Sequence, residues 1–260
     1  MKTVLAHKLW AIALNVWREA IRDRLLHLLA GSGILLIFSA LVLGEMAVGE
    51  RGRVLQNSGF FVIGLWGLVT VIYIGSNILK REIRQKTIYM VLSRPVTRPV
   101  FLIGKFFGTV SVLFCLFCIL VAAWMFLLQL FSVPIRTQHM ISLFFIFGEW
   151  MLLAALSLFF ASFTSPILHN FFLIGITFLG HWSNDLYIFS QNTQALWLKT
   201  LLKSIYYILP NLEALNFREM ALYNQHVANS MLAEGALVLL GWIVCALFAA
   251  NVIFMKRKLL

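Results

Sequence analysis

Residues 59–105 read GFFVIGLWGLVTVIYIGSNILKREIRQKTIYMVLSRPVTRPVFLIGK, an apolar run followed by a strongly basic segment. The run from 59 to 79 carries no charge and has the ~20-residue length that a helix needs to cross a ~30 Å hydrocarbon layer. Between 79 and 105, seven residues are basic, one is acidic and two are proline. This contrast predicts a membrane span joined to a compact, positively charged loop at the membrane surface.

The whole composition indicates an integral membrane protein. The chain has 260 residues, is 61% hydrophobic and 12% charged, whereas a soluble domain carries about 25% charged residues. We therefore expect an all-α polytopic membrane protein with six transmembrane helices, folded as a single domain over residues 1–260. In the third span, Gly104 and Gly108 form a G-x-x-x-G pattern that permits close helix approach. The expected spans cover about 25–44, 59–79, 104–131, 140–163, 170–189 and 232–255.

The distribution of basic residues predicts the orientation of the chain in the membrane. With the N-terminus inside, the cytoplasmic segments hold 15 Lys and Arg and three acidic residues, and the outer segments hold six basic and five acidic residues. Both termini are therefore expected in the cytoplasm, in agreement with an even number of spans. The net charge of +11 is explained by this topology and by attraction to the lipid bilayer, so nucleic acid is not an expected partner.

Two further segments have helical apolar spacing without the length of a span. Residues 2–22 predict an N-terminal interfacial helix on the cytoplasmic membrane surface, with one apolar side and Trp10 and Trp17 at headgroup level. The segment 190–231 is the longest expected extracytoplasmic segment. Within it, an apolar stripe between Leu198 and Leu209, with Lys199 and Lys203 opposite, predicts a short interfacial helix that ends before Pro210.

The basic loop has the spacing of a short amphipathic helix followed by a rigid turn. Ile83, Thr87 and Val91 recur every four residues, and Pro95 ends the pattern. One interpretation is a solvated loop anchored to lipid phosphates. The other is a docking element, a stiff cationic helix that a cytoplasmic partner contacts and pushes.

The same loop resembles the cytoplasmic loop of the ABC-2 type permeases, the membrane subunits of type V ABC exporters. The similarity rests on Arg81-Glu82, Lys86-Thr87, the run Val91-Leu92-Ser93-Arg94-Pro95-Val96-Thr97-Arg98, and Gly104-Lys105. The glycine that the family usually has before the threonine is Lys86 here. A shorter segment, YYILPNLEALNF at 206–217, is similar to the nitrous-oxide-reductase maturation and gliding-type branch of the family.

The resemblance implies a permease that forms a translocation pathway with a second copy or a homologue in the cytoplasmic (inner) membrane of a bacterium, with export as the expected direction. A separate cytoplasmic ABC ATPase would dock on the surface helix and on the loop at 80–98, the coupling helix of the family. The expected ATPase-coupling residues are Arg81, Glu82, Arg84, Lys86, Thr87, Arg94, Pro95 and Arg98.

The chain lacks the phosphate-binding loop of an ATPase. That loop needs G-x-x-x-x-G-K followed by Ser or Thr, but Phe106 follows Gly104-Lys105 and Pro99 stands where the first glycine belongs. We therefore expect no enzyme activity, no cofactor and no metal in this chain, with ATP and Mg²⁺ bound by the partner.

Three polar residues inside the expected spans are candidates for the substrate path. Glu149 lies mid-span, where an ionised acid costs ~2.5–3.5 kcal/mol, so it should face the bundle interior. It would either hydrogen-bond a neighbouring span or line the substrate path or the interface between permeases. His181 and Asp185 are four residues apart near the outer end of the fifth span, and are expected to share a helix face.

Two alternative functions use the same residues or the same fold class. An intramembrane enzyme could use Glu149, His181 and Asp185, but the spans contain no H-E-x-x-H, no G-x-S-x-G and no paired aspartates. A secondary transporter would show two related halves and broken midplane helices, and neither is evident in the sequence. The nature of the cargo does not follow from the residues.

Overall fold

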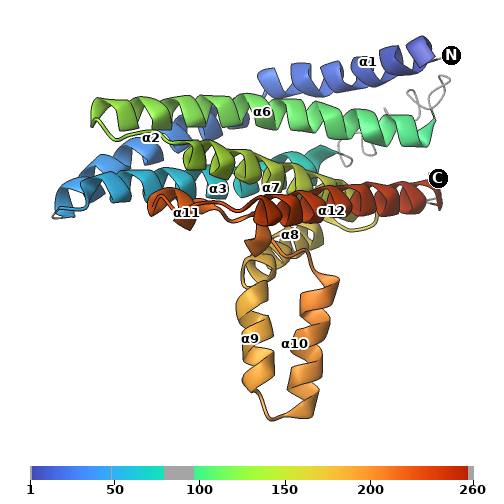
Figure 1. Cartoon of the computed structure of the whole chain (residues 1–260). Coiled ribbons are helices and arrows are strands. Elements are labelled where there is room, and N and C mark those ends of the chain that lie inside the picture. Colours follow the sequence, from blue (N-terminus) through green and yellow to red (C-terminus); the bar gives the residue numbers. More distant parts are fainter. Residues whose placement is uncertain (1, 48, 79–96, 257–260) are drawn as a thin grey trace.

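The computed structural model describes residues 2–47, 49–78 and 97–256, and within these ranges all regular structure is helical. This confirms the expected all-α polytopic fold (Figure 1). Among the described residues, five helices are long and apolar enough to cross a membrane, and one apolar helix, α8 (Pro166–His181), is shorter. The five are α2 (Arg24–Met46), α3 (Arg51–Ile78), α6 (Arg98–Leu130), α7 (Thr137–Ala161) and α12 (Asn229–Lys256).

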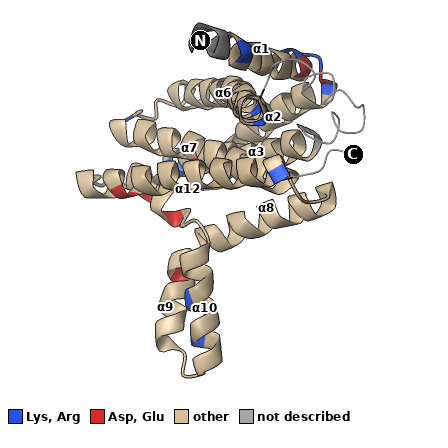
Figure 2. Cartoon of the chain, turned by 90° about the vertical axis from the view of Figure 1, so that its right-hand side faces the viewer, with Lys and Arg blue, Asp and Glu red and all other residues tan. Residues whose placement is uncertain are grey.

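The long helices lie alongside one another as a bundle, with α7 the most buried of the five (Figure 1). The beginning of α1 (Lys2–Ile21) and the end of α12 lie at the same end of this bundle, as the predicted topology requires. The bundle helices carry few charged residues along their length (Figure 2). At ~1.5 Å per residue, α3 and α6 are ~42 and ~50 Å long, so each extends beyond a ~30 Å hydrocarbon layer.

Three glycines on α3 allow bulky side chains from α6 and α7 to pack against its backbone. Gly59 contacts the indole of Trp124 on α6, and Gly67 contacts the indole of Trp150 on α7. Gly75 contacts the hydroxyl of Ser157, also on α7. At ~100° per residue, glycines eight residues apart are rotated by ~80° from one to the next, so they wind around α3 from the side that contacts α6 to the side that contacts α7, and a larger residue at any of them would overlap its neighbour.

The prediction of a helix at the N-terminus is confirmed by α1, which packs parallel to the first half of α6, and its expected position on the cytoplasmic membrane surface stays a prediction. Ile12 lies over Gly104, and one turn later Val16 lies over Gly108. The G-x-x-x-G pattern of α6 therefore forms a close helix contact, as expected, and its partner is α1.

The expected continuous fifth span at 170–189 is wrong. Helix α8 ends at His181 and α9 (Ser183–Asn192) begins after Trp182, which caps both helices. Asn211 stabilises this break from a distant part of the chain: its Oδ1 accepts a hydrogen bond from Ser183 Oγ (2.6 Å), and its Nδ2 donates to Asn184 Oδ1 (3.3 Å). His181 and Asp185 therefore lie on different helices and do not share a helix face.

Helices α9 and α10 (Leu196–Ile208) form a hairpin that projects away from the bundle (Figures 1 and 2). The short helix expected before Pro210 is confirmed as α10. The chain then returns to the bundle through a 3-10 turn, η1 (Glu213–Leu215), and α11 (Arg218–Leu222). Leu212, Leu215 and Phe217 of this returning segment are buried, so it is part of the core.

Candidate functional site

The expected coupling residues at 81–95 lie outside the described residues, but both ends of the loop are described. Arg81, Glu82, Arg84, Lys86, Thr87, Arg94 and Pro95 belong to the undescribed part, and their roles stay predictions. The loop follows the end of α3 and precedes α6, which begins at Arg98.

The entering helix α3 is bonded to the turn between α1 and α2. Tyr73 donates its hydroxyl hydrogen to Asp23 Oδ2 over 2.6 Å. The other carboxylate oxygen of Asp23 accepts from the backbone N–H of Leu25 over 2.9 Å and so caps the N-terminus of α2. One carboxylate thus joins the end of α3 to the beginning of α2.

The leaving helix α6 is bonded to the end of α12. Arg98 donates from one guanidinium nitrogen to the backbone carbonyls of Phe254 and Met255, each over 2.9 Å. These carbonyls belong to the last turn of α12, where the helix has no intrahelical donors left and its dipole favours a positive charge. Arg98 therefore holds the first residue of α6 against the C-terminus of α12.

Inside the bundle, the structure brings Glu149 on α7 next to His181 at the end of α8. Oε1 of Glu149 lies 3.6 Å from Nε2 of His181, and the Glu149 side chain is 9% exposed. Nδ1 of His181 lies 3.0 Å from the carbonyl oxygen of Thr177, which can only accept a hydrogen bond, so Nδ1 carries a hydrogen. The other ring nitrogen faces the carboxylate, and the two form an ion pair when the ring is protonated.

The returning segment packs beside this pair. Leu212 donates its backbone N–H to the carbonyl of Gly180 over 3.1 Å, and Ser142 of α7 donates to the carbonyl of Phe217 over 2.8 Å. The rings of Phe145 and Phe217 lie 4.5 Å apart. These contacts join the segment at 211–217 to α7 and α8. The sequence analysis had placed this segment in the extracytoplasmic stretch at 190–231, outside the spans.

Glu213 of the returning segment lies close to the same polar group. Both of its carboxylate oxygens accept from Asn216 Nδ2, over 3.2 and 3.3 Å. Burial raises the pKa of Glu213, and the nearby charges of Asp185 and Glu219 add to this rise, while the Asn216 hydrogen bond and His181 oppose it. Asp185, exposed on α9, contributes to this electrostatic environment from outside the Glu149–His181 pair.

The comparisons with known proteins identify the family. The sequence model of one family, described as ABC-2 family transporter protein, matches residues 39–259, which is most of the chain. The chain belongs to the ABC-2 transporter family. It is a multi-pass membrane protein and a permease subunit of an ABC transporter, a family of transport components that work with a cytoplasmic ATPase. No curated protein matches the chain.

The permease contains a serine–histidine–asparagine arrangement that the sequence analysis missed. Ser157 Oγ lies 3.0 Å from His169 Nε2, and His169 Nδ1 lies 3.0 Å from Asn170 Oδ1. This is the order of nucleophile, base and orienting group. However, Ser157 is 2% exposed and His169 1%, and both pack under Gly75 of α3. The arrangement therefore joins α3, α7 and α8 and offers no access to a substrate.

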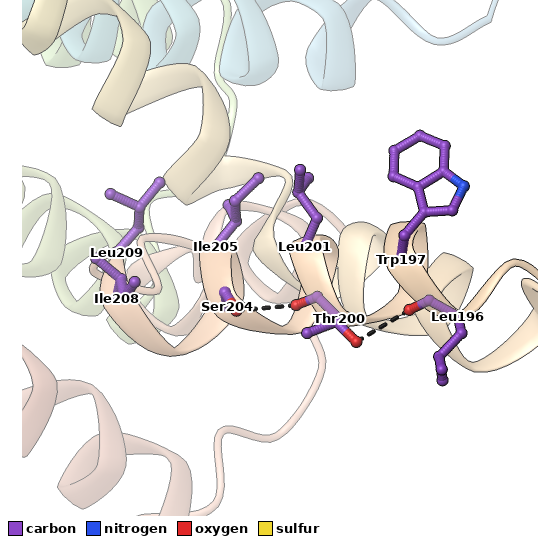
Figure 3. A pocket seen from close by; sticks show the side chains of 8 residues that line it. All are labelled: Leu196, Trp197, Thr200, Leu201, Ser204, Ile205, Ile208 and Leu209. Carbon is purple, nitrogen blue, oxygen red and sulfur yellow. Dashed lines mark hydrogen bonds between the residues drawn. The ribbon is translucent and has the colours of Figure 1, made fainter.

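The hairpin of the permease presents an apolar face. Trp197, Leu201, Ile205 and Leu209 point to one side of α10 and line an open groove of about 700 Å³ (Figure 3). Leu202 is buried instead, and Tyr206 packs on Tyr187 of α9 with 4.8 Å between ring centroids. The apolar stripe expected at 198–209 is thus divided between the contact with α9 and the open face.

The polar groups of the permease do not form a metal site in the part of the chain that the structure describes. No three His, Cys, Asp or Glu side chains within these ranges approach closely enough to hold a metal ion. The enzyme alternative needed Glu149, His181 and Asp185 to converge, and the structure pairs the first two alone.

The raised pKa of Glu213 predicts a pH-dependent effect of replacing it with glutamine. The carboxyl group of Glu213 has a higher pKa in the folded state than its value of ~4.3 in the unfolded chain. Its ionisation therefore lowers the free energy of unfolding as the pH rises from ~4.3 through the folded-state pKa. Glu213→Gln should therefore melt like the wild type at about pH 4 and at a higher temperature at about pH 7.5. Thermal unfolding of the purified permease in detergent measures this, with Glu234→Gln, at an exposed position on α12 whose charge does not act on Glu213, as control. A difference between Glu213→Gln and wild type that does not change with pH would contradict it.

Proposed function

We propose that this permease forms the translocation pathway of an ATP-driven exporter and is moved by a separate cytoplasmic ATPase that contacts residues 80–98. The observation that carries this proposal is that both ends of the segment are bonded to other helices of the bundle. Tyr73 bonds Asp23 between α1 and α2, and Arg98 bonds the last turn of α12.

These bonds supply a physical route for mechanical coupling. A force on the segment between α3 and α6 would act on both helices because the chain is continuous. Through Asp23 it would also reach α2, and through Arg98 it would reach α12. The close contact of α1 with Gly104 and Gly108 adds a third connection. One cytoplasmic contact would thus displace α1, α2, α3, α6 and α12 together.

The remaining parts of the proposal follow from the family and the charge pattern. The positive-inside distribution supports cytoplasmic termini, and the resemblance to the family supports an inner-membrane location in a bacterium. ATP and Mg²⁺ would be bound by the ATPase, and the permease itself would need no cofactor or metal. It would pair with a second copy or a homologue, and the segment at 206–217 supports the nitrous-oxide-reductase maturation and gliding-type branch.

The test is the recovery of an ATPase with the tagged permease. We expect a protein with a Walker motif to co-purify with the full chain. Replacing residues 80–96 with a Gly/Ser segment of equal length, which keeps Arg98, should abolish co-purification. The control replaces the hairpin tip at 193–195 in the same way and should retain the ATPase. Retention after the 80–96 replacement, or equal loss in both variants, would refute the proposed docking site.

A further inference from the structure

We propose that the end of the bundle opposite the two chain ends contains a binding site for a phosphate-like anion. The turn before α3, the loop between α6 and α7, and the end of α11 enclose a pocket of about 310 Å³ there. By the positive-inside pattern this is the extracytoplasmic end. The lining residues are Gly49, Glu50, Gly52, Arg53, Gln56, Ser132, Val133, Pro134, Arg136, His139, Ala221 and Leu222.

The charged side chains that line the pocket, Glu50, Arg53 and Arg136, have a net charge of +1. Glu50 pairs with Arg53 across 3.2 Å. Arg136 lines the same pocket, and among the described residues no carboxylate lies within ion-pair distance of it. Arg51, which begins α3, is already paired with Glu45 over 2.6 Å and does not line the pocket. A guanidinium without a carboxylate at the rim of a polar pocket favours an anionic ligand.

Two largely buried side chains with hydrogen-bond donors line the pocket. His139 is 1% exposed, and its Nδ1 accepts the backbone N–H of Arg136 over 3.1 Å. The hydrogen of the neutral ring is therefore on Nε2, and that atom has no hydrogen-bond partner in the described structure. Gln56 is 8% exposed and lines the pocket, and its amide makes no hydrogen bond with the described residues and is not closed off from the pocket. Nε2 of His139 is closed off from the pocket in this structure, so the Gln56 amide is the donor that an acceptor oxygen of a ligand would reach directly.

The backbone N–H groups at the beginnings of two helices also favour an anion in this pocket. Helices α3 and α7 both begin at the pocket, at Arg51 and Thr137. The first N–H groups of a helix have no intrahelical acceptor, and the helix dipole is positive at that end. Phosphate has several acceptor oxygens and a size that suits the pocket. The free ion and the phosphate of a lipid headgroup share this chemistry.

The full-length chain, purified without the ATPase, tests the proposal independently of coupling. After delipidation, equilibrium dialysis with radiolabelled orthophosphate measures binding of the free ion, and native mass spectrometry before delipidation detects a retained phospholipid. Saturable orthophosphate binding without a lipid adduct assigns the site to the free ion. A single retained phospholipid assigns it to a headgroup.

Three variants show whether the binding belongs to this pocket. Arg136→Gln, at an exposed position, should weaken orthophosphate binding at least about tenfold or remove the lipid adduct, because it loses a charge-assisted bond. Gln56→Leu should weaken it several-fold without a change in charge. Arg51→Gln removes the same charge at the same end of the bundle and should leave binding within about twofold. The proposal is overturned if neither ligand binds, or if Arg51→Gln weakens binding as much as Arg136→Gln.

Discussion

Replacing Gly67 with alanine should lower the melting temperature of the permease markedly. A methyl group at this position on α3 would overlap the indole of Trp150, which is 1% exposed on the most buried helix of the bundle. The indole cannot move without displacing α7, and overpacking of this kind costs typically 1–3 kcal/mol and occasionally more. Because about 1 kcal/mol corresponds to ~2–4 °C for a protein of this size, the expected loss is ~5–10 °C. Thermal unfolding of the purified chain in detergent measures it.

The same substitution at Gly241 provides a matched control. Gly241 lies in α12, and a Cβ added there would have no atom within 4 Å. Alanine is a better helix former than glycine by ~0.5–1 kcal/mol, so Gly241→Ala should melt at the same temperature as the wild type or higher. Equal melting temperatures for Gly67→Ala and Gly241→Ala would contradict the packing of α3 on α7.

The apolar runs of the sequence predict the long helices well because burial in lipid requires little more than length and composition. The ends of α2, α7 and α12 fall within about three residues of the expected spans. Helices α3 and α6 begin eight and six residues earlier than expected. The first turns of these two helices carry the charged residues Arg51, Arg53 and Arg98. A span predicted from apolar residues alone begins after such charged turns, although the turns are helical.

The break at Trp182 and the burial of the segment at 211–217 could not be predicted in the same way. Both depend on contacts between residues far apart in the chain, such as Ser183 with Asn211 and Ser142 with Phe217. No periodic pattern marks them. The pairing of Glu149 with His181 has the same origin, since the two residues come from different helices. The small residues Gly59, Gly67 and Gly75 within an apolar run were a usable signal for the close packing of α3 that the sequence analysis did not use.

Replacing Arg98 with glutamine should separate ATP hydrolysis from movement of α12. Arg98 makes two charge-assisted hydrogen bonds to the carbonyls of Phe254 and Met255, and such bonds contribute ~1.5–3 kcal/mol each. Glutamine retains a donor but lacks the charge and the reach. Under the proposed function, the ATPase should still co-purify with the variant and hydrolyse ATP, because residues 80–96 are unchanged. The force on α6 should no longer reach α12.

Lys256, the exposed last residue of α12, can carry a reporter cysteine for this movement because a thiol there can ionise in water. In a Lys256→Cys chain whose Cys115, Cys118 and Cys245 are replaced by serine, the rate of thiol labelling by a maleimide should change when ATP is trapped on the ATPase with vanadate. In Arg98→Gln this nucleotide-dependent change should shrink roughly tenfold, as expected for the loss of ~1.4 kcal/mol of coupling. Arg98→Lys should be intermediate, since an ammonium keeps the charge without the planar donor geometry.

An arginine at the opposite end of the bundle controls for a general effect of lost charge. Arg136→Gln removes an exposed guanidinium in the loop after α6, at the other end of that helix from Arg98, and should leave the labelling response of the Lys256→Cys reporter unchanged. If the labelling rate in Arg98→Gln changes with trapped nucleotide as much as it does in the wild type, α12 is not moved through Arg98. If Arg98→Gln instead loses the ATPase altogether, Arg98 belongs to the docking surface, and its bonds to α12 are secondary to that contact. Retained ATPase with a reduced response of the Lys256→Cys reporter would assign Arg98 the role of a mechanical link between α6 and α12.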